Sequence, residues 1–318
     1  MAKTPTIKRV DRTGEWAQRY RDSEKQLFRH YDLSPVEHTI RLKDPDLRLR
    51  ALEQGTGPPL ILVPGGNGEA VSYVRLMREL QGWRVITFDR PGGGMSDAVN
   101  HLEVDLRQLA VQILGAVFDH FHLENVPVVA NSMGGLWTFW FALDRSARIN
   151  RIVQLGCPAL LLGTSAPLFN RLLSVPGLNR MLLPLMQPDG PEEARDGLLR
   201  MGSPEATLRE IPDIMAETVC LEFNSPQYPL AWLSLMRAAL RLWGANTKYR
   251  LDEKALGRIT QPTLFVWGEK DPFGGVETGR QAIEILPDAQ IIELDAGHLP
   301  FIDAPEFCAH QIREFLSG

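Results

Sequence analysis

Short apolar runs alternate along this chain with longer segments whose apolar residues recur at the spacing of a helix. Each run ends at or just before glycine, proline or a polar residue, as a strand buried on both faces commonly does. The runs are 59–63, 84–88, 126–130, 152–156, 263–267 and 290–294, and the helical segments are 104–121, 134–143, 277–286 and 305–316. This alternation predicts an α/β fold, with a mostly parallel, doubly wound sheet covered by helices on both faces.

The chain departs from this alternation at two places. Residues 13–31 have helical spacing and precede two strand-like runs around Asp44-Pro45-Asp46, which predicts an N-terminal helix and a hairpin. Residues 159–259 contain no convincing strand but several helix-like segments, such as 230–243. We therefore expect residues 1–158 and 260–318 to form one core, and residues 159–259 to form a helical cap inserted between two of its strands.

Composition and charge narrow the classes of partner. Hydrophobic residues make up 44% and charged residues 23% of the 318 residues, the ordinary balance of a soluble protein with a sizeable core. The 34 basic and 39 acidic residues are scattered, which argues against nucleic acid as a partner. The most apolar long stretch, Val126–Leu143, is interrupted by polar residues and glycines, so no membrane span is expected.

The cysteines and the N-terminus bear on the compartment. Cys157, Cys220 and Cys308 are far apart and form no CxxC spacing, and the basic N-terminus lacks the apolar segment of a secretory signal. We therefore expect reduced thiols in a cytoplasmic protein. The chain has no spacing typical of metal ligands, and no cofactor is expected.

The sharpest local signal is a serine between a buried strand and a helix. In Val128-Val129-Ala130-Asn131-Ser132-Met133-Gly134-Gly135, small residues stand two before and two after Ser132. Such a turn strains the serine backbone and needs small neighbours where the strand and helix come close. It also places the hydroxyl near the helix N-terminus, where developing negative charge is favoured. Ser132 is therefore the candidate nucleophile.

A glycine-rich loop, Pro64-Gly65-Gly66-Asn67-Gly68, follows the earlier strand 59–63. Without side chains, its backbone N–H groups can approach a substrate oxygen, and we expect the amides of Gly66 and Met133 to form an oxyanion hole. A tight turn that merely ends a strand would also explain the glycines. Asn67 and Asn131 are candidates for contact with substrate.

A base and a carboxylate must come from later in the chain if their order is serine, acid, histidine. Asp271 follows strand 263–267, and His298 follows strand 290–294. Both lie beyond the carboxyl ends of predicted parallel strands, where such sheets gather their ligand-binding residues. The rival carboxylates are Glu269, close to Asp271, and the two that flank the histidine in sequence, Asp295 and Asp303.

These motifs together resemble the α/β-hydrolase superfamily, because they occur in that family's order from about Val36 to the C-terminus, the cap excepted. They are the glycine-rich loop, Asp89-Arg90-Pro91-Gly92-Gly93-Gly94-Met95-Ser96-Asp97, Asn131-Ser132-Met133-Gly134-Gly135, Gly268-Glu269-Lys270-Asp271 and Gly297-His298. The resemblance implies a catalytic triad of Ser132, Asp271 and His298. We expect Asp89 and Arg90 to bond to nearby backbone as part of a structural turn.

The expected chemistry is acyl transfer to Ser132 from a small-molecule carbonyl substrate, with release by water. Hydrolysis of an ester or lactone is the leading hypothesis. The second is hydrolysis of a carbon–carbon bond in a ring-fission dienoate, because the elbow is similar to that of meta-cleavage hydrolases, although Leu299 stands where those enzymes tend to have tryptophan. A third is a non-catalytic ligand receptor on the same fold.

The predicted cap supplies the residues that would choose the substrate. Its apolar side chains could line a pocket or could pack the cap against the core. They are Phe169, Leu172, Met181, Met186, Met215, Phe223, Trp232 and Met236. One of its arginines could hold a substrate carboxylate, while most are solvated. They include Arg171, Arg180, Arg195, Arg200, Arg237 and Arg241.

Overall fold

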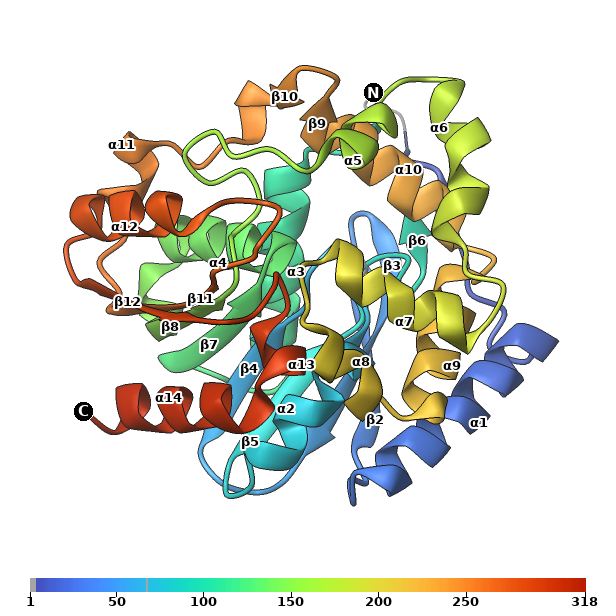
Figure 1. The fold of residues 1–318 in the computed structure, drawn as a ribbon, viewed down its shortest axis with the longest axis horizontal. Coiled ribbons are helices and arrows are strands. Elements are labelled where there is room, and N and C mark those ends of the chain that lie inside the picture. The colour runs from blue at the N-terminus through green and yellow to red at the C-terminus, as the bar shows by residue number, and fades with distance from the viewer. Residues whose placement is uncertain (1–3, 67) are drawn as a thin grey trace.

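The computed structural model describes residues 4–66 and 68–318, and its centre is an eight-stranded sheet (Figure 1). The strand order is β12-β11-β8-β7-β4-β5-β3-β2. The β2–β3 and β3–β5 pairs are antiparallel and the other pairs are parallel, which confirms the predicted sheet. The strands are β2 (Val36–Lys43), β3 (Asp46–Gln54), β4 (Pro59–Val63), β5 (Arg84–Phe88), β7 (Val126–Asn131), β8 (Ile149–Leu155), β11 (Thr263–Gly268) and β12 (Ala289–Leu294).

Helices cover both faces of this sheet (Figure 1). Successive residues of a strand point to opposite faces, so a strand buried on both sides contributes to two cores. In β4, Ile61 and Val63 join the core under α3 and α4, whereas Leu60 and Leu62 join the core under α2 and α14. The helices of the core are α1 (Glu15–His30), α2 (Val74–Glu79), α3 (Leu106–His120), α4 (Met133–Asp144), α12 (Val276–Ile285), α13 (Pro300–Asp303) and α14 (Pro305–Ser317).

The predictions for the core agree with these elements to within a few residues, but they missed its short pieces. The missed pieces are the helices α2 and α13 and a small antiparallel pair, β1 (Ile7–Lys8) with β6 (Ala98–Val99). Among the described residues, no helix combines the length and the apolar character that crossing a membrane requires.

Residues 159–259, which we call the inserted segment, lie between β8 and β11 and are mostly helical (Figure 1). The helices are α5 (Leu168–Leu172), α6 (Leu178–Leu182), α7 (Pro191–Arg200), α8 (Glu205–Glu210), α9 (Asp213–Phe223), α10 (Tyr228–Ala239) and α11 (Glu253–Leu256).

The predicted helix over 230–243 was too long. The helix α10 ends at Ala239, and the chain continues as β9 (Leu240–Arg241) paired with β10 (Gly244–Ala245), so the prediction that this segment holds no strand was also wrong. Apolar residues at helical spacing continued past the real end of the helix. Trp243, the last of them, is 82% exposed and packs into no core.

The helix α9 joins the inserted segment to the N-terminal helix of the core. On α1, Trp16 donates its indole N–H to the carbonyl of Leu221 at 2.9 Å, and the hydroxyls of Ser23 and Thr218 are bonded at 2.7 Å. The buried carboxyl of Glu222 accepts the backbone N–H of Gly94. The N-terminal helix therefore helps to hold the inserted segment on the core.

Gly134 lets α4 approach β4 closely. A Cβ atom at Gly134 would lie 2.2 Å from the carbonyl oxygen of Val63 and 2.6 Å from that of Pro64, both backbone atoms. Backbone cannot move aside as a flexible side chain can, so the helix could not keep this position with a larger residue.

We expect Gly134→Ala to lower the free energy of unfolding by roughly 2 kcal/mol or more, because α4 would have to move away from β4. Gly115→Ala is the matched control, since Gly115 is also helical but its Cβ atom would meet only a side-chain atom of Phe141 at 3.9 Å. It should raise stability by up to about 1 kcal/mol through helix propensity. Equal effects in urea titrations would contradict this account of the packing.

Candidate active site

The sharp turn at Ser132 is the most strained feature of the site. β7 ends at Asn131 and α4 begins at Met133, and Ser132 between them has φ 51° and ψ −117°. A non-glycine residue held in such a conformation costs on the order of 1–3 kcal/mol and persists only where its surroundings enforce it. The turn places Ser132 just after the carboxyl end of β7, where it lines the cavity described below.

Asn131 ties this turn to two neighbouring loops. Its side-chain nitrogen donates to the carbonyl of Leu155 at 2.7 Å and to that of His298 at 3.0 Å. Its oxygen lies close to Gly65, where a Cβ atom would come within 2.5 Å of it. Asn131 lines the cavity described below, but its amide nitrogen is thus engaged by backbone, which favours a positioning role over the predicted contact with substrate.

His298 and Asp271 form a buried hydrogen-bonded pair. The Nδ1 atom of His298 lies 2.8 Å from Oδ2 of Asp271. The carboxyl also accepts the backbone N–H groups of Cys157 and Phe273, each at 2.8 Å. The Phe273 ring stacks on the imidazole with centroids 4.1 Å apart. The imidazole and the carboxyl are therefore each held by more than one contact.

The other acidic side chains that were candidates for this role lie away from the imidazole or bond to other groups. Asp303 accepts the backbone N–H of Gly297 at 2.8 Å, and Asp295 forms an ion pair with Lys270. Glu269 is exposed. Of these acidic side chains, the structure brings Asp271 to the imidazole.

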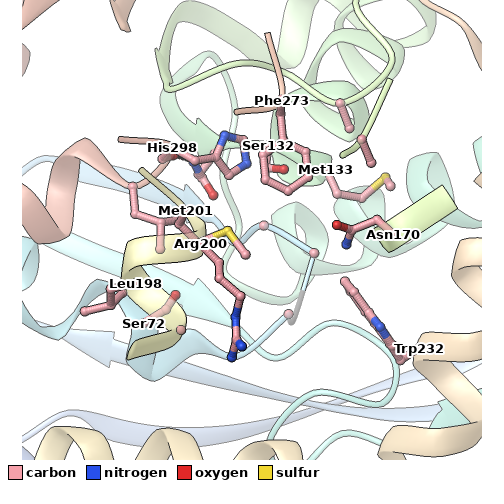
Figure 2. Close-up of a pocket in the computed structure, with 18 of the residues that line it drawn as sticks. Ser72, Ser132, Met133, Asn170, Leu198, Arg200, Met201, Trp232, Phe273 and His298 are labelled. Carbon is pink, nitrogen blue, oxygen red and sulfur yellow. Dashed lines mark hydrogen bonds between the residues drawn. The ribbon is translucent and has the colours of Figure 1, made fainter. Parts of the chain in front are cut away.

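Ser132 and His298 line the same cavity, whose volume is about 210 Å³ (Figure 2). Gly66 and Met133 line it too, and neither amide donates a hydrogen bond to another described residue. Asn67, predicted to contact substrate, lies outside the described residues. Within 4–66 and 68–318, no group of three or more His, Cys, Asp or Glu side chains is arranged as metal ligands.

The inserted segment supplies much of the cavity wall. Its apolar side chains there include Met186, Met215, Phe223, Trp232 and Met236, all predicted as pocket candidates. Phe169 and Leu172 are not in the wall, and Met181 is 68% exposed on the surface. Among the arginines named above, the cavity wall includes Arg200 (Figure 2).

Sequence reasoning missed two buried polar residues of the wall, Asn170 and Glu69. Glu69 is 5% exposed, and its Oε2 atom has no hydrogen-bond partner among the described residues. Burial, and then the negative charge of Asp89, raise the pKa of Glu69 to about 7 against the opposing effect of Arg90. The sequence pattern around a single acidic residue after a glycine-rich loop does not predict that the residue is buried.

Asp89 and Arg90 bond to nearby backbone, as expected. Asp89 accepts the N–H groups of Ala70 and Met95, each at 2.8 Å. Arg90 donates through its guanidinium to the carbonyl of Gly66 and through its backbone N–H to that of Gly68. The end of β5 therefore supports the glycine-rich loop that follows β4.

A sequence model of the alpha/beta hydrolase family matches residues 60–311. The chain belongs to this family. The match spans the sheet from β4 onward, the turn at Ser132, the inserted segment and the His298–Asp271 pair, so the predicted fold class is confirmed.

Known alpha/beta hydrolases of two kinds are similar to this chain. A 2-hydroxy-6-oxononadienedioate/2-hydroxy-6-oxononatrienedioate hydrolase from Cupriavidus pinatubonensis is 27% identical, over 80% of this chain and 84% of its own length. A 2-hydroxy-6-oxo-6-phenylhexa-2,4-dienoate hydrolase from Burkholderia cepacia is 24% identical, over 77% and 82%. The structure of carboxylesterase CesB from Bacillus subtilis superposes with a TM-score of 0.72 at 17% identity, covering 96% of this chain and all of that one. The chain is thus a hydrolase of this family.

The raised pKa of Glu69 predicts a pH-dependent stability. In the folded protein the Glu69 carboxyl keeps its proton up to about pH 7, whereas in the unfolded chain it loses the proton above pH 4.5. The contribution of this proton to the stability of the folded protein is therefore complete below pH 4.5 and is lost as the pH rises to about 7. Glu69→Gln stays neutral throughout. We expect the stability of the wild type, measured by urea unfolding, to fall relative to this variant by at most about 3 kcal/mol over that window.

The control for this measurement is Glu314→Gln, because Glu314 is an exposed carboxylate near the C-terminus. Its stability should follow the wild-type pH curve. A Glu69→Gln curve that runs parallel to the wild type from pH 4.5 to 8 would show that Glu69 titrates as an ordinary carboxylate.

Proposed function

We propose that this hydrolase cleaves a small to medium, largely apolar carboxylic ester or lactone through an acyl-enzyme on Ser132. The observation that carries the proposal is the buried Nδ1–Oδ2 bond between His298 and Asp271, beside the strained turn at Ser132. The carboxyl already accepts two backbone N–H groups, so it acts as acceptor and Nδ1 of the imidazole as donor. The other ring nitrogen then carries the lone pair that a general base needs.

In the proposed reaction, His298 takes the hydroxyl proton of Ser132 as its oxygen attacks the substrate carbonyl. The amides of Gly66 and Met133 stabilise the oxyanion, and they suit this role because neither donates to another described residue. His298 then gives its proton to the departing alcohol. A water activated by the same imidazole releases the acid and restores Ser132.

The inserted segment would act as the cap that selects the substrate. Its methionines and aromatic side chains make much of the wall, and such a wall binds hydrocarbon by removing it from water. Flexible methionine side chains also accommodate several shapes. These features support an apolar ester as substrate, with residues 159–259 as the cap.

A second candidate is hydrolysis of a carbon–carbon bond in a ring-fission dienoate. Two observations favour it: the curated relatives described above act on such compounds, and Arg200 lies in the wall with no hydrogen-bond or ion-pair partner among the described residues. A guanidinium there could pair with the carboxylate of a dienoate. Leu299 follows the histidine where meta-cleavage hydrolases tend to have tryptophan, and this difference favours ester hydrolysis.

A substrate panel separates the two functions. We expect p-nitrophenyl esters with acyl chains of two to eight carbons to be cleaved with a higher kcat/KM than 2-hydroxy-6-oxo-6-phenylhexa-2,4-dienoate. Ser132→Ala should lower kcat for the esters by about a thousandfold or more, because the nucleophile is lost. A dienoate cleaved faster than every ester would replace the first proposal by the second.

Arg200→Leu sharpens this comparison, with Arg180→Leu as its control. Arg180 is also an exposed arginine of the inserted segment but lies outside the cavity wall. Ester hydrolysis should survive both changes, since an apolar ester has no carboxylate to pair. A loss of dienoate cleavage in Arg200→Leu alone would assign the arginine to carboxylate binding.

A further inference from the structure

Asn170 is a buried residue of the cavity wall whose amide has no partner among the described residues. It lies on α5, is 9% exposed, and neither donates nor accepts a hydrogen bond with another described residue through its side chain. Figure 2 shows the amide pointing into the cavity, on the same side as Met133 and Trp232. No hydrogen bond to a described residue therefore explains why an amide, and not an apolar group, stands at this position.

The other buried asparagines in the described part of the chain have internal partners. Asn131 donates to two carbonyls, and Asn179 accepts the backbone N–H of Arg180 at 2.9 Å. An amide that faces a largely apolar cavity and bonds to no other described residue is placed to bind a polar group of the substrate.

The position of Asn170 indicates which part of the substrate it meets. Because His298 protonates the leaving group in the proposed reaction, that group must depart on the imidazole side of Ser132. Figure 2 shows Leu198 and Met201 on the His298 side of Ser132, and Asn170 and Trp232 on the opposite side. Asn170 therefore faces the acyl part.

We infer that Asn170 is a specificity residue that hydrogen-bonds a neutral polar group, such as an oxo or hydroxyl oxygen, on the acyl part of the substrate. The inference rests on the proposed function and narrows it to acyl groups that are apolar apart from one such oxygen. An amide suits a neutral partner because it carries no charge of its own and offers both donors and an acceptor. The surrounding methionine and tryptophan side chains cover the rest of the acyl chain.

Matched pairs of esters test this inference. Each pair shares the p-nitrophenolate leaving group and differs in one position: 4-oxopentanoate against pentanoate, and 5-oxohexanoate against hexanoate. Each enzymatic rate is divided by the rate of hydrolysis by hydroxide, which removes differences in intrinsic reactivity. We expect the wild type to prefer at least one oxo ester by about tenfold in kcat/KM.

In Asn170→Leu and Asn170→Ala the ratio of kcat/KM for the oxo ester to that for the plain ester should fall to about one. It should fall because kcat/KM for the oxo ester decreases, while kcat/KM for the plain ester does not increase. Asn170→Gln, which keeps the amide, should retain part of it. Thermal unfolding checks that each variant folds, and Asn170→Leu should not lower the Tm because the replaced amide bonds to no other described residue.

The outcomes separate this inference from the proposal beneath it. Ser132-dependent hydrolysis of all four esters with the same ratios in wild type and Asn170→Leu would overturn the role of Asn170 and leave the proposed function intact. A wild type that shows no preference for either oxo ester would do the same. No Ser132-dependent hydrolysis of any of the four esters would overturn both.

Discussion

The contact between the first turn of α4 and the end of β4 is the constraint on which the site depends. Gly134 lies against the backbone carbonyls of Val63 and Pro64, so the chain must turn from β7 into α4 within a single residue. That residue is Ser132, and its positive φ is the consequence. The same contact places the N-terminus of α4 next to the glycine-rich loop, where Gly66 and Met133, whose amides donate to no other described residue, line one cavity with the serine.

The remaining parts of the site are brought to this turn by the sheet. The loops after β4, β7, β8, β11 and β12 all lie at the carboxyl ends of parallel strands, the edge at which such sheets bind ligands. Asn131 joins three of these loops through its bonds to the carbonyls of Leu155 and His298. Asp271 in turn joins the β11 loop to the β8 loop through the N–H of Cys157. Buried hydrogen bonds thus hold the imidazole in one orientation above the serine turn.

The core of the fold and its motif residues could be predicted because they depend on local patterns. Apolar runs of strand length and the small residues around Ser132 are visible in the sequence, and the structure agrees with both. The end of α10 could not be predicted, because the helical spacing of apolar residues continues through Leu240 to the exposed Trp243. Periodicity cannot tell a buried apolar residue from an exposed one.

Asn170 and Glu69 escaped prediction for a related reason. Each is an ordinary polar residue that the fold buries in the cavity wall, and this burial is created by elements far away in sequence. The choice of Asp271 among several acidic residues likewise follows from the fold, which places Asp303 on a backbone N–H and Asp295 on a lysine. The substrate could not be predicted from the sequence either, because the cavity wall is assembled from many short helices.

The most direct test of the central claim, that Ser132 is the nucleophile, is the mass of the enzyme caught during turnover. The protein is mixed with excess p-nitrophenyl ester, quenched in acid within milliseconds to seconds, digested and examined by mass spectrometry. We predict the mass of one acyl group on the peptide that contains Ser132, and none in Ser132→Ala. An acyl group on a different residue, or full ester hydrolysis by Ser132→Ala, would contradict the claim.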